Sequence, residues 1–385
     1  MNLLISAGEA SGDLHGARLL GALRAARPDL RAFGMGGTRL EAAGLERIVR
    51  SEALSVVGVY EVIEKLPVLR RALSALDAAA RRRKPRAAIL IDFPDFHGLL
   101  GRKLRRAGVP LIYYISPQVW AWRPHRAHRI AESARRIITL FPFETEIYRR
   151  LGADVVCAGH PLVEDVREGL ALPSPLPQKT RRRLVLLPGS REGELRRHWD
   201  SMAEAAAMLA GRLDLELIAI RAQGLSEGLF PRAAERGIRI ATGGTHPILA
   251  SADLALVASG TATLEAALCG TPMVVVYRTS AFSWAIAQAL IRLRWASLVN
   301  IVAGEEVVPE LIQDDLTVEN LVRESEGLLT SPERLETMRV GLARVSQELG
   351  PPGASARAAQ YVLSALDAAP DSASHLPAPA SRSAP

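Results

Sequence analysis

Short apolar runs alternate with longer amphipathic stretches along most of this chain, and this alternation limits the folds that it can adopt. Leu3–Ala7, Ala87–Ile91 and Leu111–Ile115 are almost entirely apolar, as expected of parallel strands that are buried on both faces. Leucines within residues 66–83 recur at three- and four-residue intervals, which is helical spacing. Strand–helix–strand alternation of this kind predicts an α/β fold with a doubly wound parallel sheet.

The pattern stops at residues 171–180, ALPSPLPQKT, which contain three prolines, and then begins again. Strands are predicted at Leu184–Leu187, Leu215–Ile220, Leu254–Ala258 and Met273–Tyr277. We therefore predict two Rossmann-like, doubly wound domains that face a central cleft. The predicted parts are an N-terminal domain over residues 1–170, a C-terminal domain over 181–350, a helix over 351–366 and a disordered Ala/Pro/Ser-rich tail over 367–385.

The composition agrees with two ordinary globular domains. The chain has 385 residues, 48% of them hydrophobic, and only two cysteines, which excludes a chain disordered throughout and a disulfide scaffold. Neither a secretory leader nor a run of about 18 apolar residues is visible in the sequence. The formal net charge of +7 allows a polyanionic partner. Arginine runs such as Arg81–Arg83 and Arg181–Arg183 are interpreted as solvated helix ends or loops.

Two motifs of the first half follow strands, and ligands of open α/β sheets bind outside the carboxyl ends of the strands. GEASGD begins at Gly8, and its Ser11 is predicted to cap the following helix, whose N-terminus favours an anion or a sugar hydroxyl. IDFPDF places Asp92 at the end of a buried strand, where a carboxylate suits a general base toward a hydroxyl. Asp95 is a candidate ligand contact, or else the N-cap of the next helix. Glu9 is a candidate contact, or else a solvated residue of a plain turn.

A third motif, SPQVWAWRPHRAHRI, combines aromatic and basic residues after the strand at 111–115. Aromatic faces bind sugar or acyl surfaces, and arginine binds phosphate. Trp120, Trp122 and Arg123 are therefore candidate contacts, and the alternative is two core tryptophans beside a solvated basic helix.

The second half has two motifs that suit phosphate binding. In LPGSREGEL, a strand ends in a glycine–serine turn, so backbone N–H groups, Ser190 and Arg191 suit a diphosphate. In SGTATLEAALCGTP, the first turn of a helix offers N–H donors, and Glu265 is placed to accept from a ribose diol. The candidate contacts of this second motif are Ser259, Gly260, Thr261, Thr263 and Glu265. The segment 280–300 suits either an interfacial helix on an anionic membrane or a core helix with snorkelling arginines.

These motifs, in this order, resemble the lipid-A-disaccharide synthase family of glycosyltransferases over about residues 1–350. The resemblance rests on GEASGD, IDFPDF, SPQVWAWR, LPGSREGE and SGTATLEAAL…GTPMVVVYR. It implies a GT-B fold and an inverting transfer from UDP-2,3-diacylglucosamine to 2,3-diacylglucosamine 1-phosphate (lipid X). The products would be a β-1,6-linked disaccharide 1-phosphate and UDP. Val299 and His97 depart from the family, which usually has proline and often asparagine there.

The resemblance also assigns roles to residues. It places the catalytic base at Asp92 and adds Asn300, Glu310 and Gln313 to the substrate contacts. It implies a peripheral protein on the cytoplasmic leaflet of the inner membrane, with no cofactor, no metal and no nucleic acid as partner. The oligomeric state stays open, a homodimer included.

Three other functions are compatible with parts of the pattern. One is another enzyme of the same fold that uses UDP-N-acetylglucosamine, such as an undecaprenyl-linked transferase or a 2-epimerase, although the WAWR and IDFPDF motifs argue against it. Another is a non-catalytic protein that binds a UDP-sugar or a membrane. A third is RNA binding through the arginine-rich patches, which would depend on salt concentration.

Overall fold

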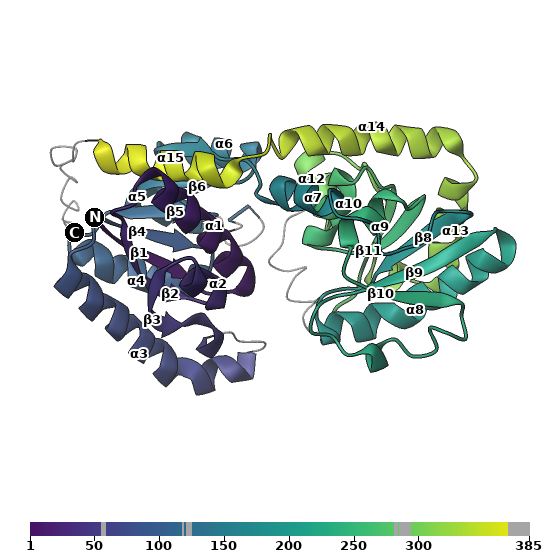
Figure 1. The fold of residues 1–385 in the computed structure, drawn as a ribbon, viewed down its shortest axis with the longest axis horizontal. Helices are drawn as coiled ribbons and strands as arrows, with labels where there is room; N and C mark the ends of the chain where they lie inside the picture. Colours follow the sequence, from purple (N-terminus) through teal and green to yellow (C-terminus); the bar gives the residue numbers. More distant parts are fainter. Residues whose placement is uncertain (55–58, 118, 121–124, 281–283, 285–293, 369–385) are drawn as a thin grey trace, which may run out of the picture. The chain divides into compact units, whose positions relative to one another are not determined.

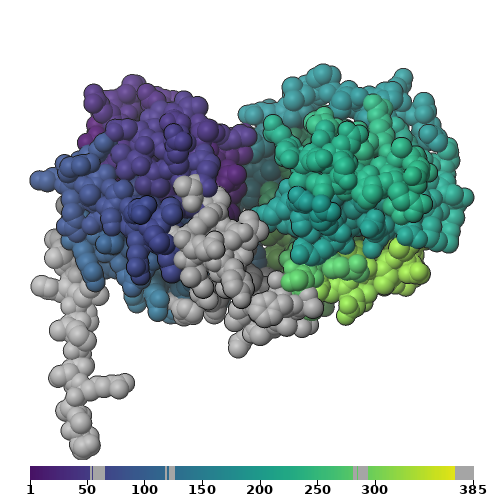
Figure 2. Space-filling view, turned by 90° about the horizontal axis from the view of Figure 1, so that it is seen from below, coloured from purple at the N-terminus to yellow at the C-terminus, as the bar shows by residue number. Residues whose placement is uncertain are grey.

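The computed structural model describes residues 1–54, 59–117, 119–120, 125–280, 284 and 294–368, and it divides into two compact units (Figure 1). The first unit comprises Met1–Ile115, Ser133–Ile138 and the residues from Ser355 onward, and the second comprises Ser116–Glu132 and Thr139–Ala354. The surfaces of the two units are coloured along the sequence in Figure 2, from purple and blue to teal and yellow-green. The predicted boundaries at 170 and 181 stay a prediction.

One parallel sheet has seven strands in the order β3-β2-β1-β4-β5-β6-β7. Its strands are β1 (Asn2–Ala7), β2 (Arg31–Gly36), β3 (Leu45–Arg50), β4 (Ala87–Ile91), β5 (Leu111–Tyr114), β6 (Ala134–Thr139) and β7 (Val155–Cys157). Its helices are α1 (Ala10–Ala26), α2 (Thr38–Ala42), α3 (Val59–Arg83), α4 (Pro94–Arg106), α5 (His125–Ser133) and α6 (Pro142–Arg150). The next helix, α7 (Leu162–Leu170), packs in the second unit. All five residues of β4 are buried, as the apolar run predicts.

The other parallel sheet has six strands in the order β10-β9-β8-β11-β12-β13. Its strands are β8 (Arg182–Leu187), β9 (Leu215–Arg221), β10 (Ile238–Thr242), β11 (Leu254–Ala258), β12 (Met273–Tyr277) and β13 (Glu310–Ile312). The helices are α8 (Glu192–Arg212), α9 (Thr245–Ala250), α10 (Thr261–Leu268), α12 (Leu298–Ala303), α13 (Val318–Leu329) and α14 (Pro332–Glu348). The prediction of two parallel α/β sheets is confirmed, and each sheet has helices packed on it (Figure 1).

The last described helix, α15 (Ala354–Asp367), belongs to the first unit. The Arg136 guanidinium donates to the Tyr361 carbonyl at 3.1 Å and to the Ser364 hydroxyl at 2.7 Å. The Arg86 guanidinium donates to the Leu366 carbonyl at 2.8 Å. These bonds join α15 to β6 and to the residue that precedes β4. The tail predicted over 367–385 begins too early, because Asp367 is the last residue of α15. The tail residues from 369 onward lie outside the described residues.

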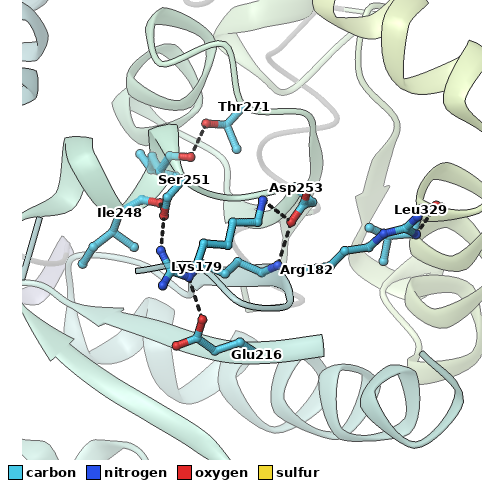
Figure 3. A network of polar contacts seen from close by, with 10 residues as sticks. Lys179, Arg182, Glu216, Ile248, Ser251, Asp253, Thr271 and Leu329 are labelled. Carbon is cyan, nitrogen blue, oxygen red and sulfur yellow. Dashed lines mark hydrogen bonds and ion pairs between the residues drawn. The ribbon is translucent and has the colours of Figure 1, made fainter. Parts of the chain in front are cut away.

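The end of the proline-rich linker is held by a buried arginine, Arg183. Figure 3 shows the surrounding network, in which Lys179, Glu216, Ser251 and Asp253 are labelled. Arg183 is 2% exposed, and its guanidinium donates to Glu216 Oε2 at 2.6 Å, Ser251 Oγ at 3.0 Å and the Pro177 carbonyl at 2.6 Å. The interpretation of 181–183 as a solvated run is therefore wrong at Arg183. The alternation of a strand turns this side chain inward, toward a carboxylate on the neighbouring strand β9.

The same contacts extend to the linker itself. Asp253 accepts from the Arg183 backbone N–H at 2.7 Å and from the Lys179 ammonium at 2.7 Å. Two charged residues therefore fix Pro177 and Lys179 against the second sheet, and the linker is ordered where it enters β8.

Candidate functional site

Each sheet has one point where its strand order reverses, and the sequence motifs lie there. In the first sheet the reversal falls between β1 and β4, so the loops that begin at Gly8 and Asp92 are neighbours. A Cβ atom on Gly8 would lie 2.2 Å from the Phe93 ring. Only glycine therefore fits at this position, and the two loops are packed directly against each other at the place where open α/β sheets bind ligands.

Asp92 occupies an unusual backbone position at this point. Asp92 and Phe93 have φ angles of +51° and +56°, in the left-handed region that non-glycine residues rarely adopt. Such strained positions cluster at functional sites. The side chain is half-buried, and the Asp92 backbone N–H donates to the Ile115 carbonyl at 3.2 Å. The strained pair places a carboxylate at the end of β4.

The surroundings of Asp92 change its acidity. Burial raises the pKa of the Asp92 carboxyl from 3.8 to about 6, and the nearby Glu9 carboxylate acts in the same direction. The Phe93 backbone hydrogen bond opposes this rise in pKa. A carboxyl with a pKa near 6 is ionised at neutral pH yet basic enough to accept a proton from a hydroxyl.

A histidine holds the backbone of Asp92 from inside the unit. His97 is buried, its Nδ1 atom hydrogen-bonds the Asp92 carbonyl, and its Nε2 atom lies 2.9 Å from Ser6 Oγ on β1. Burial lowers the pKa of the His97 imidazole to about 4, so the ring is neutral at pH 7. Because a carbonyl only accepts, Nδ1 carries the proton and Nε2 accepts from the Ser6 hydroxyl. Sequence reasoning gave this residue no role.

The GEASGD motif divides into exposed and structural positions. Glu9 is exposed and is the N-cap residue of α1, whereas exposed Ser11 lies inside the helix, and no capping side-chain hydrogen bond is found. The expectation that Ser11 caps α1 is therefore wrong. Asp13, which sequence reasoning left without a role, accepts from the backbone N–H groups of Gly37, Arg39 and Leu40 at 2.6, 3.0 and 3.1 Å.

The remaining candidates of the first half lie on α4 and after β5. Asp95 is exposed in the first turn of α4, whose N-cap residue is Phe93, so the alternative of Asp95 as N-cap is wrong. Trp120 Nε1 donates to Glu144 Oε1 at 3.0 Å, and its ring meets Phe143 edge-on at 5.4 Å. Trp122 and Arg123 lie outside the described residues.

In the second sheet the strand order reverses between β8 and β11. The turn after β8 contains Gly189 at φ +130° with exposed Ser190 and Arg191, and α8 begins directly after it. Arg191 pairs with Glu194 at 3.0 Å on the protein surface. The turn after β11 contains Gly260 at φ +145°, which is the N-cap of α10. Two helices thus begin at this reversal, and their first N–H groups are suited to bind phosphate.

The hydroxyl candidates differ in their surroundings. Ser259 Oγ donates to the Ala296 carbonyl at 2.8 Å, and buried Thr263 Oγ1 donates to the Gly260 carbonyl at 2.8 Å. These two hydroxyls shape the loop, whereas Thr261 is exposed at the start of α10. Glu265 lies one turn into the helix, with Oε1 3.3 Å from His246 Nε2.

Asn300, Glu310 and Gln313 form a scaffold behind these loops. The buried Asn300 amide accepts from the Val308 N–H at 3.0 Å and donates to Glu310 Oε1 at 2.8 Å. Glu310 accepts from the Ala296 and Ser297 N–H groups at 2.7 and 2.9 Å, and Gln313 Oε1 accepts from the Thr279 N–H at 2.6 Å. Through these bonds Asn300, Glu310 and Gln313 connect α12 to β13 and to the loop after β12. Val299, which precedes Asn300, is buried.

His198 was missed by sequence reasoning although it joins the loop after β8 to the loop after β12. It is buried on α8, its Nδ1 atom lies 2.8 Å from the Pro188 carbonyl, and its Nε2 atom accepts from the Arg278 N–H at 2.9 Å. Burial lowers the pKa of this imidazole, which keeps it neutral, as the acceptor role requires. The sequence offered no signal because both partners are backbone atoms.

Two findings concern the described residues as a whole. Within the described ranges, His, Cys, Asp and Glu side chains form no group of three or more that could hold a metal ion. None of the helices in that part of the chain combines the length and the apolar character needed to cross a membrane.

Solved structures of other proteins share this fold. A crystal structure of CalG4, the calicheamicin glycosyltransferase, superposes with a TM-score of 0.63 at 17% identity, over 96% of this chain and 99% of that one. A crystal structure of UDP-GlcNAc 2-epimerase from Neisseria meningitidis superposes with a TM-score of 0.63 at 12% identity, over 94% of this chain and 100% of that one. Identities this low establish the GT-B-type α/β fold alone.

Sequence comparison is more specific. The family model described as lipid-A-disaccharide synthetase matches residues 3–363. The lipid-A-disaccharide synthase of Myxococcus xanthus is 41% identical over 377 residues, 94% of this chain and 97% of the relative. That of Geobacter sulfurreducens is 41% identical over 372 residues with the same coverage. The chain therefore belongs to the lipid-A-disaccharide synthetase family.

Proposed function

We propose that this protein is a glycosyltransferase that makes the lipid A disaccharide. It transfers 2,3-diacylglucosamine from its UDP derivative to the 6-hydroxyl of 2,3-diacylglucosamine 1-phosphate and releases UDP. Family membership supports the reaction, and the single structural observation that carries it is the half-buried, strained Asp92 at the strand reversal of the first sheet.

The chemistry that we assign to Asp92 is general-base catalysis. Its carboxylate accepts the proton of the acceptor 6-hydroxyl as that oxygen attacks the anomeric carbon of the donor. The bond from this carbon to the diphosphate oxygen breaks, and UDP leaves with the electron pair. One displacement inverts the configuration and gives a β-1,6 linkage. His97 and Ser6 keep the backbone of the base in place.

The second unit binds the donor in this proposal. Backbone N–H groups at the starts of α8 and α10, with Ser190, Arg191 and Thr261, hold the diphosphate and stabilise the charge that develops on departing UDP. Ser259, Gly260 and Thr263 shape the second loop, and Glu265 accepts from the ribose. Asn300, Glu310 and Gln313 support these loops through the scaffold described above.

Both substrates carry acyl chains, so we propose that the protein works at the cytoplasmic leaflet of the inner membrane. The net charge of +7 supports attraction to anionic lipid. Glu9, Ser11, Asp95, Trp120, Trp122 and Arg123 remain proposed substrate contacts.

The choice of donor tests this function. Purified protein is mixed with lipid X and either UDP-2,3-diacylglucosamine or UDP-N-acetylglucosamine in buffer containing EDTA, and products are identified by mass spectrometry. We expect disaccharide 1-phosphate from the diacylated donor alone. Transfer or epimerisation with UDP-N-acetylglucosamine, and no reaction with the diacylated donor, would contradict the proposal. EDTA in the same assay tests the expectation that no metal is needed.

The dependence of rate on pH tests the base. Asp92 acts only when deprotonated, so kcat/KM rises with pH, is half-maximal near the pKa of about 6 and then levels off. Glu9→Gln removes a negative charge that raises the pKa of Asp92, so its acidic limb moves to lower pH. Glu235→Gln, on the second unit, is the control and keeps the wild-type profile. If the acidic limb of Glu9→Gln lay at the same pH as that of the wild-type protein, the assignment of this limb to Asp92 would be contradicted.

A further inference from the structure

The carboxylate of Glu265 has a partner that the sequence motif does not contain. His246, in the first turn of α9, lies with Nε2 3.3 Å from Glu265 Oε1. Both side chains are mostly buried, with 16% of His246 and 25% of Glu265 exposed. A carboxylate oxygen can only accept, so this contact requires a proton on Nε2. The imidazole therefore restricts the orientation of the carboxylate while leaving part of it open to solvent.

The imidazole is itself held in place by packing. A Cβ atom on Gly169 of α7 would lie 1.9 Å from His246 Nδ1, so the ring rests directly on the backbone of that helix. Cys269, the C-cap residue of α10, donates from its Sγ atom to the His246 carbonyl at 3.6 Å. The backbone of His246 is therefore held at the end of α10 and its imidazole lies against α7, so a larger residue at 169 would displace the ring.

A fixed carboxylate matters for recognition of a diol. A glutamate that is free to rotate loses rotamer entropy when it binds a ligand, whereas one that is already oriented does not. An ionised carboxylate has about four lone-pair directions, so one bond from His246 leaves acceptor capacity for two adjacent hydroxyls. The position of Glu265, one turn into the helix after β11, suits the ribose of a nucleotide whose diphosphate lies at the start of that helix.

We propose that His246 is a positioning residue that aims Glu265 at the ribose hydroxyls of the UDP donor, and that Gly169 makes the space for its imidazole. This inference rests on the proposed function and adds two residues from outside the recognised motifs to its nucleotide site. It predicts that recognition of the ribose 2′-hydroxyl depends on residues that do not touch the ligand.

The test compares equilibrium binding of UDP and 2′-deoxy-UDP by calorimetry. The wild-type protein is expected to prefer UDP by about 10- to 100-fold, the range for hydrogen bonds to charged groups. In His246→Ala the preference falls to about threefold or less. His246→Gln keeps an N–H donor near the Nε2 position and restores most of the preference. A purely structural role for His246 would weaken both ligands equally and leave their ratio unchanged.

A matched pair of glycine substitutions tests the packing step. Gly169→Ala pushes the imidazole away and lowers the preference for UDP, although alanine favours a helix over glycine by about 1 kcal/mol. Gly211→Ala, on α8, meets nothing within 4 Å and keeps the wild-type preference. These variants, with His246→Gln, carry the test if His246→Ala does not fold.

Three results would overturn the inference, and they are distinguishable. A full preference for UDP in His246→Ala would show that His246 does not position Glu265, and a full preference in Gly169→Ala would show that the space at Gly169 is not needed for this positioning. Equal affinity of the wild-type protein for UDP and 2′-deoxy-UDP would show that Glu265 does not bind the ribose 2′-hydroxyl, and it would not contradict the proposed transfer reaction. Absence of UDP binding in the wild-type protein would overturn the proposed function, and this inference with it.

Discussion

Asp92→Asn lowers turnover by about 10²- to 10⁴-fold, the contribution expected of a general base, and leaves UDP affinity unchanged. The amide keeps the size of the carboxylate and tolerates the left-handed backbone at this position, but it cannot accept the proton of the acceptor. Steady-state rates and UDP calorimetry on the same preparation check this. Turnover within about threefold of the wild-type rate would show that Asp92 is not the base.

The same variant is expected to be more stable than the wild-type protein at pH 7. The pKa of the Asp92 carboxyl is about 6 in the folded state against 3.8 for an unperturbed group. The folded state therefore binds more protons between these values, and its stability falls as the pH rises through that interval. At about 1.4 kcal/mol per pKa unit, the loss by pH 7 is about 3 kcal/mol.

Urea unfolding at pH 7 and at pH 4 measures this difference. Asparagine does not ionise, so the excess unfolding free energy of Asp92→Asn is about 3 kcal/mol at pH 7 and falls toward zero near pH 4. His97 has the opposite effect on stability. Because its pKa is lowered in the folded state, the free energy of unfolding falls as the pH drops below 6.5. Each comparison is therefore made at one pH. Asp200→Asn, on the surface of α8, is the control with no such gain.

Arg183→Ala is expected to destabilise the second unit by about 3–5 kcal/mol, the cost of removing one member of a buried ion pair. The substitution leaves Glu216 without its cation and the Pro177 carbonyl without its donor, at 2.6 Å each in the intact protein. The free energy of unfolding, from urea or thermal denaturation, measures the loss.

Arg181→Ala, two residues earlier, is the matched control. Arg181 forms a surface pair with Asp214 at 3.5 Å, and their side chains are 51% and 77% exposed, so its removal costs about 1 kcal/mol or less. Equal losses in the two variants would contradict the assignment of Arg183 as the anchor of the linker.

The strands that the sequence predicted are those in the middle of the sheets. β4, β11 and β12 are buried on both faces and therefore read as unbroken apolar runs. β3 and β6, with the sequences LERIVR and ARRIIT, carry charges that interrupt this signal. Ile115 was expected to end β5, but its φ of +61° takes it out of the strand.

The site was predictable where it consists of local motifs. Asp92 and Glu265 follow strand ends in recognisable boxes, so their neighbourhoods could be inferred from the order of the elements. His97, His198 and His246 contact backbone atoms or residues that are distant in sequence. Their roles depend on how helices pack on the sheets, and a single sequence does not reveal such contacts.

The anomeric configuration of the product tests the central claim most directly. Wild-type protein is supplied with UDP-2,3-diacylglucosamine and lipid X, and the new linkage is determined by NMR spectroscopy. A single displacement assisted by Asp92 predicts a β-1,6-linked disaccharide 1-phosphate, formed with release of one UDP. An α linkage would contradict a single displacement, and failure to form any disaccharide would contradict the proposed reaction.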